Sequence, residues 1–193
     1  MPTAEFFGKT YTVEGVILIK TIAVHAGRIN RNFDMFEPDE LEAAAHTYDN
    51  CNLVFVDHEY GATDEDLSAF EDGIDRSRTR GFIVAEHYDS ETQDLHCLMA
   101  IDKNYKNLVD AIMSGKLGAV SMGCTCDLYC SICNTLFDED HDCECGSCPR
   151  YIGTISNDGQ LVYDILRNVE FYELSCLAIE QAEPRALFYE VIA

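Results

Sequence analysis

Short apolar runs rich in β-branched residues are the feature that most limits how this chain of 193 residues can fold. Each run is long enough for one strand, and none reaches the roughly 20 apolar residues of a membrane-spanning helix. Strands are predicted over residues 12–23, 52–56, 80–87, 94–101 and 167–179. The third and fourth of these runs flank a short polar segment, which predicts a hairpin.

Two further stretches have the apolar spacing of helices. The first opens at Pro38, which suits the first turn of a helix, and ends near residues 48–50. The second covers residues 104–114, and Gly115 follows it as a typical C-terminal cap. With strands in the majority, we expect an α+β, mainly β fold over residues 1–193, built as a single domain.

Composition narrows the classes of function. Apolar residues make up 47% of the chain, which is enough for a substantial core, and the formal net charge is −22. Such a charge disfavours nucleic acid and anionic membranes as partners, and it is typical of a highly soluble protein or one that works among basic proteins. The first residues lack the basic and apolar regions of a signal peptide.

Three apolar runs carry residues with catalytic potential. Ser121 ends a short apolar run within the stretch 116–123 and has a glycine on either side, His58 follows the strand predicted over 52–56, and Glu173 lies in the final run near Ser175. A serine, a histidine and a carboxylate are the parts of a nucleophilic hydrolase. A rigid strand would aim His58, whereas the other histidines have no such placement. The run around Ser121 is not the Gly-x-Ser-x-Gly elbow of α/β-hydrolases, because position 119 is alanine.

The third member of such a triad has rivals to Glu173. Glu170, Asp57 and Glu59 are other carboxylates on the same runs. Asp57 and Glu59 flank His58 directly, and neighbours on a strand point to opposite faces, so their geometry is poorer.

Seven of the ten cysteines lie between Cys124 and Cys148. Without an export signal, clustered thiols indicate metal ligands rather than disulfides. Two Cys-x-x-Cys turns can place four thiolates in a tetrahedron around zinc. The four predicted ligands are Cys130, Cys133, Cys145 and Cys148, with Cys143 and His141 as alternatives.

This zinc is expected to be structural. A closed four-thiolate site leaves no position for substrate, and neither His-Glu-x-x-His nor the zinc deaminase pattern is present. The metal would stabilise an insert over residues 124–150. Cys124 and Cys126 are left as spare thiols or as ligands in a second arrangement.

Four stretches, taken in order, resemble the prohead (capsid maturation) serine proteases of tailed bacteriophages. These are residues 30–38 with the helix that follows, 53–58, 112–123 and 172–186. The fold of that family is similar to the herpesvirus assemblin protease. The resemblance implies an assemblin-like barrel or sheet with flanking helices, into which the zinc-ribbon-like loop is inserted.

The resemblance also implies the roles of the site residues. Ser121 would be the nucleophile, His58 the general base and Glu173 the carboxylate that orients His58, with the amides of Met122 and Gly123 as oxyanion donors. The implied activity is a serine endopeptidase that cleaves scaffold or core proteins, capsid protein segments and itself. It would act inside the prohead, in the host cytoplasm. The oligomeric state is left open, a homo-oligomer included.

Two non-enzymatic interpretations remain open beside this one. The chain could be a non-catalytic structural or assembly protein of the virion, with a protease-like fold and a zinc-stabilised contact loop. It could also be a zinc-ribbon adaptor. Only the enzyme requires the Ser121 hydroxyl within about 2.6–3.2 Å of His58, or slightly more when no substrate is bound.

Overall fold

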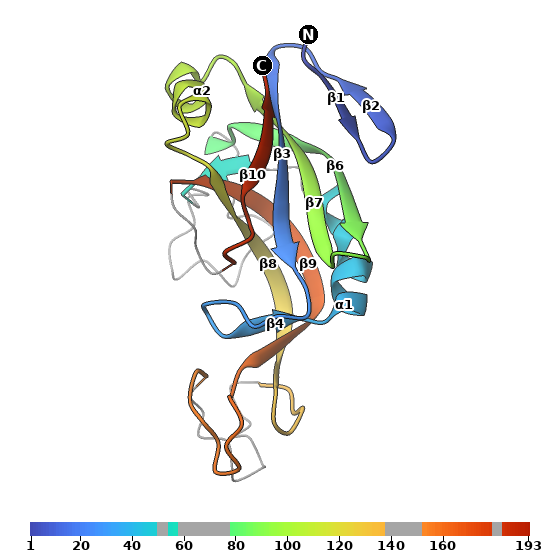
Figure 1. Cartoon of the computed structure of the whole chain (residues 1–193), viewed down its shortest axis with the longest axis vertical. Helices are drawn as coiled ribbons and strands as arrows, with labels where there is room; N and C mark the ends of the chain where they lie inside the picture. Colours follow the sequence, from blue (N-terminus) through green and yellow to red (C-terminus); the bar gives the residue numbers. More distant parts are fainter. Residues whose placement is uncertain (50–53, 58–77, 138–151, 179–182) are drawn as a thin grey trace.

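The computed structural model describes residues 1–49, 54–57, 78–137, 152–178 and 183–193. Within them the chain is mainly β, as the sequence predicts (Figure 1). The strands are β1 (Thr3–Phe6), β2 (Lys9–Thr12), β3 (Val16–His25), β4 (Asp34–Phe36), β5 (Val54–Val56), β6 (Gly81–Asp89), β7 (Asp94–Asp102), β8 (Ala119–Cys130), β9 (Asp164–Leu177) and β10 (Phe188–Ile192). The helices are α1 (Pro38–Ala44), the 3-10 helix η1 (Ala45–Asp49) and α2 (Lys106–Met113).

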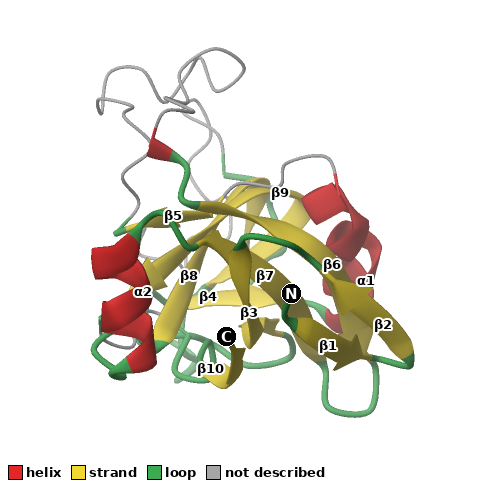
Figure 2. Cartoon of the chain, turned by 90° about the horizontal axis from the view of Figure 1, so that it is seen from above, coloured by secondary structure: helices red, strands yellow, loops and turns green. Residues whose placement is uncertain are grey.

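One curled sheet of eight strands forms the body of the molecule. Its order is β10-β3-β7-β6-β5-β9-β4, and β8 pairs with the other edge of β9. The curl brings β8 back to the segment just before β10, where Ala119 and Leu187 form an antiparallel bridge. The Val120 amide donates to the Ala186 carbonyl at 2.9 Å, so the two ends of the sheet are hydrogen-bonded to each other. Figure 2 shows the curl from above, with α1 and α2 on different sides of it.

Strand β3 explains why one run of the sequence is almost continuously apolar. Ile17 and Ile19 face the main core inside the curl, whereas Val16 and Leu18 face a second, smaller core. The hairpin of β1 and β2 covers that second core with Ala4, Phe6 and Tyr11. A strand buried on both faces has no polar side to alternate with. The sequence predicts a single strand over 12–23, and this hairpin was not predicted.

Both predicted helices are confirmed. Helix α1 begins at Pro38 and continues into η1, which ends at Asp49. Helix α2 is followed by Gly115, whose φ of +72° is the left-handed conformation typical of a C-terminal glycine. The hairpin of β6 and β7 also forms where the sequence predicts it. Within the described residues, no helix is long and apolar enough to cross a membrane.

The C-terminus differs from the prediction. The sequence indicates no strand after Ala186, but β10 pairs antiparallel with β3. The side chains of β10 are half-buried or exposed, so the sequence has no alternating apolar pattern that would predict a strand. The strand forms by pairing with the edge of β3. Residues 61–80 lack apolar periodicity, which predicts a surface loop; as far as residue 77 they lie outside the described residues.

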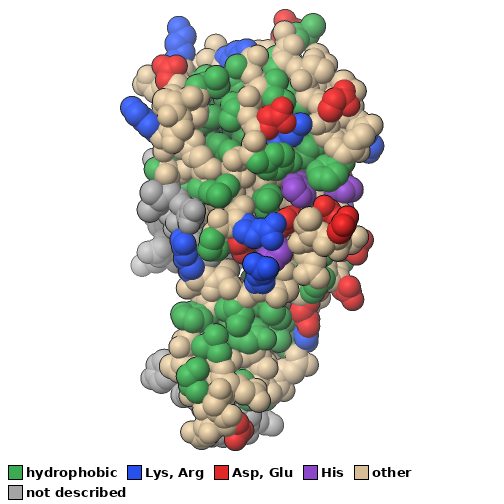
Figure 3. All heavy atoms as spheres, in the orientation of Figure 1, with side chains coloured by type: hydrophobic (Ala, Val, Ile, Leu, Met, Phe, Trp, Pro, Cys, Tyr) green, Lys and Arg blue, Asp and Glu red, His purple; other side chains and the backbone are tan. Residues whose placement is uncertain are grey.

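The insert after β8 continues at the lower end of the molecule, where β8 and β9 extend together beyond the rest of the sheet (Figure 1). A turn forms at residues 157–159, where Ile155 and Leu161 pair across it and Gly159 has a φ of +80°. Hydrophobic side chains gather over this end in Figure 3, in keeping with the exposure of Leu136, Ile152 and Ile155.

Candidate active site

The three runs that carry the predicted catalytic residues become neighbouring strands. Strand β5 pairs parallel with β9 over residues 174–176, and β8 pairs antiparallel with the other edge of β9. Phe55 of β5 and Ser121 of β8 both have Ser175 as their register partner. Tertiary structure therefore brings together segments separated by more than 50 residues in the sequence.

Ser121 lies on one face of this three-stranded part together with polar residues of β9. Its direct partner is Ser175, and Gly123 is the direct partner of Glu173. Partners opposite each other in a sheet share a face, and side chains two apart on a strand do too. Ser121, Ser175 and Glu173 therefore share one face, while Val120 and Met122 pack on the main core at the opposite face.

Glu173 and Ser175 form a buried polar pair. Both side chains are fully buried, and the Ser175 hydroxyl donates to Oε2 of Glu173 at 2.7 Å. A buried carboxylate costs free energy unless it accepts hydrogen bonds, and a bond to a charged acceptor is stronger than a neutral one. Ser175 thus stabilises the carboxylate and fixes its orientation. This role of Ser175 was not predicted from the sequence.

Gly123 makes the space in which this carboxylate lies. A Cβ atom at position 123 would be 2.5 Å from Oε1 of Glu173 and 2.6 Å from the ring of Tyr172. Real Cβ atoms do not approach other heavy atoms this closely, so a side chain at 123 would displace one of these groups. The glycine two residues after Ser121 is therefore required by the position of Glu173.

The amides beside Ser121 alternate in direction along β8. The Val120 amide points away from β9, toward Ala186, so by strand alternation the Met122 amide also points away from β9. The amides of Ser121 and Gly123 then point toward β9. The oxyanion role of Met122 and Gly123 stays a prediction.

His58 and its neighbour Glu59 lie outside the described residues. The described segment before His58 ends at Asp57, whose amide donates to the Cys176 carbonyl at 3.3 Å and whose φ is +49°.

Burial raises the pKa of the Cys176 thiol to about 12, with further contributions from the charges of Glu173 and Asp57. Of the rival carboxylates, Glu170 is exposed. The position of His58 relative to Ser121 stays a prediction.

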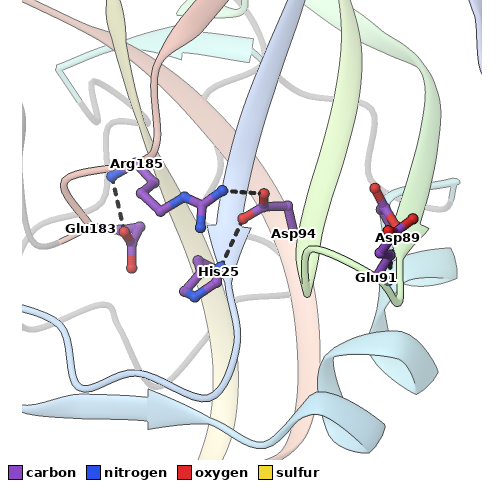
Figure 4. Close-up of polar contacts among 6 residues, drawn as sticks. All are labelled: His25, Asp89, Glu91, Asp94, Glu183 and Arg185. Atoms are coloured by element: carbon purple, nitrogen blue, oxygen red, sulfur yellow. Dashed lines mark hydrogen bonds and ion pairs between the residues drawn. The ribbon is translucent and has the colours of Figure 1, made fainter.

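A second polar cluster, missed by the sequence analysis, lies where β3, β7 and the segment before β10 meet. Asp94 accepts hydrogen bonds from Nδ1 of His25 at 2.8 Å and from Nη2 of Arg185 at 2.5 Å (Figure 4). His25 also lines a cavity of about 30 Å³, whose walls include Ser121 and Ala186. In the sequence, Asp94 is 69 positions from His25 and 91 positions from Arg185, so no local sequence pattern predicts this cluster.

One of the two predicted zinc-binding turns lies in the described part of the chain. Strand β8 ends at Cys130, and the chain reverses there, with the Asn134 amide donating to the Cys130 carbonyl at 2.8 Å. The Ile132 amide donates to Sγ of Cys130 at 3.4 Å. Cys143, Cys145, Cys148 and His141 lie outside the described residues. Within the described residues, no group of three metal-ligating side chains is found.

Cys124 and Cys126 lie on the core face of β8 and contact each other. The hydrogen bond between their thiols raises the pKa of Cys124 and lowers the pKa of Cys126. They are a thiol pair separate from the Cys130 turn.

Comparison with known proteins supports the fold. No protein-family profile and no curated protein sequence matches the chain. Among solved structures, the bacteriophage T4 capsid assembly protease gp21 superposes with a TM-score of 0.52 and 14% identity, over 83% of this chain and 80% of that chain. The chain therefore shares the fold of a phage capsid assembly protease.

Proposed function

We propose that this chain is a serine endopeptidase of phage head maturation. The observation that carries the proposal is the polar face of β8 and β9, where Ser121 lies opposite Ser175 and beside the buried Glu173. The shared fold with a protease of capsid assembly adds support. The proposed substrates are scaffold or core proteins and capsid protein segments, cleaved inside the prohead in the host cytoplasm.

The proposed chemistry divides the work among three side chains. The Ser121 hydroxyl attacks the peptide carbonyl while His58 takes its proton, and His58 then protonates the leaving amine. Glu173 accepts a hydrogen bond from the imidazole and stabilises its charged form. Its burial supports this role, because a charge acts more strongly where water is excluded.

The Ser175 hydroxyl and the backbone amides after Ser121 are proposed to assist these three side chains. The Ser175 hydroxyl donates to Oε2 of Glu173, and Oε1, the oxygen over Gly123, is the proposed acceptor for His58. The Met122 amide, which points away from β9, is one proposed donor to the oxyanion; the Gly123 amide, which points toward β9, is the second only if it turns out of the strand pairing. Removing one donor of this kind typically costs about 10²–10³ in rate.

An active-site probe tests the serine chemistry. The purified chain is treated with a fluorophosphonate, which phosphonylates activated serines, and the modified peptide is mapped by mass spectrometry. We expect the label on Ser121 and not on Ser175, with no label in Ser121→Ala. Cleavage of a scaffold protein by a chain that carries its label on a different serine would contradict the assignment. Absence of both label and cleavage, even in assembled proheads, would favour the non-catalytic virion protein.

We propose that the insert binds one structural zinc through Cys130, Cys133, Cys145 and Cys148, with Cys143 and His141 as alternative ligands. The support is the tight turn at Cys130, with an amide directed at its sulfur. Zinc would order a segment that is too small to bury a core of its own.

Metal analysis of the purified chain is expected to give about one zinc per molecule. Cys130→Ser and Cys145→Ser should each lose the metal and expose the insert to limited proteolysis. Cys124→Ser is the matched control, since it changes a thiol outside the two turns, and it should keep the zinc. Full zinc content in Cys145→Ser would transfer that ligand position to Cys143 or His141.

A further inference from the structure

The cluster of His25, Asp94 and Arg185 joins three parts of the fold through one buried carboxylate. Asp94 is 2% exposed and lies at the start of β7, directly opposite His25 at the end of β3. These two residues belong to a paired part of the sheet and are therefore fixed relative to each other. Arg185 comes from the segment before β10 and donates to the second oxygen of Asp94 (Figure 4).

The segment that Arg185 begins, residues 185–188, is the element that connects β8 to β3. The Ala186 carbonyl accepts from the Val120 amide at 2.9 Å, and the Phe188 amide donates to the Gly118 carbonyl at 2.9 Å. On its other side, the Leu187 carbonyl accepts from the Ile22 amide at 3.2 Å and from the Thr21 hydroxyl at 2.9 Å. Every one of these contacts lies on the segment that Arg185 anchors.

Arg185 is itself held in a compact turn. Its amide donates to Oε1 of Glu183 at 2.9 Å, and the Ala186 amide donates to the Glu183 carbonyl at 3.1 Å. The guanidinium is 38% exposed, whereas its acceptor is buried, so water competes with only one side of this ion pair. An arginine that loses little freedom on pairing is a good anchor.

We propose that Arg185 and Asp94 are positioning residues for Ser121. The ion pair fixes residues 185–188, these residues fix Val120, and Val120 precedes Ser121 on β8. The inference rests on the proposed function for its catalytic part. Displacement of a catalytic group by about 1 Å typically costs about 10² in rate, so loss of this anchor should act on catalysis without any contact to the substrate.

Hydrogen exchange tests the anchoring independently of activity. In the wild type the Val120 amide should exchange slowly, because it donates to Ala186. In Arg185→Gln and Asp94→Asn its exchange should become at least about tenfold faster, since the acceptor segment is released. Arg167→Gln is the matched control, because it breaks the 2.8 Å ion pair to Glu37 at the other end of β9. Equal exchange of Val120 in Arg185→Gln and Arg167→Gln would overturn the anchoring.

Kinetics on a peptide substrate tests the catalytic part. We expect kcat to fall about 10- to 100-fold in Arg185→Gln with KM within about twofold of wild type, and Arg185→Lys to recover part of the loss. Arg167→Gln should keep kcat. A kcat in Arg185→Gln equal to that of Arg167→Gln would overturn the positioning role. An inactive wild type would overturn the proposed function and the catalytic part with it, whereas the Val120 exchange would still decide the anchoring.

Discussion

Replacing Ser121 by alanine is expected to reduce peptide-bond cleavage by a factor of about 10⁴–10⁶, because the variant has no oxygen to form the acyl intermediate. Ser175→Ala should lose only about tenfold. It leaves the nucleophile in place and removes one hydrogen bond to the buried Glu173 carboxylate. The two serines are direct partners on neighbouring strands. Comparing the two variants therefore distinguishes the nucleophile from a residue that only supports the site.

The measurement is the rate at which each purified variant cleaves a scaffold-derived protein, with products identified by intact mass. Self-cleavage of the chain during expression gives a second readout. Similar losses in Ser121→Ala and Ser175→Ala would mean that the shared polar face matters and that Ser121 is not its nucleophile. Unchanged product masses in Ser121→Ala would remove this residue from the mechanism.

Replacing Gly123 by alanine is expected to lower activity by about 10²–10³ and the free energy of unfolding by about 1–3 kcal/mol. The added Cβ would meet Oε1 of Glu173 at 2.5 Å and the Tyr172 ring at 2.6 Å. Both neighbours belong to β9 in the middle of the sheet, and Glu173 is fully buried, so its carboxylate cannot move freely. The carboxylate is then displaced from the position in which Ser175 holds it.

Gly118→Ala is the matched control for this change. Gly118 lies in the same run before Ser121, and a Cβ there would meet no heavy atom within 4 Å. Activity and thermal unfolding of the two variants are compared side by side, and a crystal structure of Gly123→Ala shows where the carboxylate has moved. Retention of full activity by Gly123→Ala would mean that the position of Glu173 is not needed for catalysis.

Elements that carry their own pattern could be predicted from the sequence. Helix α2 has apolar residues at helical spacing and a glycine after its last turn, and β6 and β7 are adjacent runs joined by a polar turn. Both signals come from residues close in sequence. Strands β1, β2 and β10 were missed, since their short, partly exposed segments are ordered by packing on β3 and its neighbours.

The sequence by itself determined that a serine, a histidine and a carboxylate end or interrupt strand-like runs, and that cysteines cluster in one insert. Only tertiary structure decided that Ser121 lies opposite Ser175, that Glu173 is buried over Gly123, and that Arg185 pairs with Asp94. The physical reason is the range of the interactions. Apolar periodicity acts between neighbours along the chain, whereas register, burial and ion pairing depend on strands far apart in sequence.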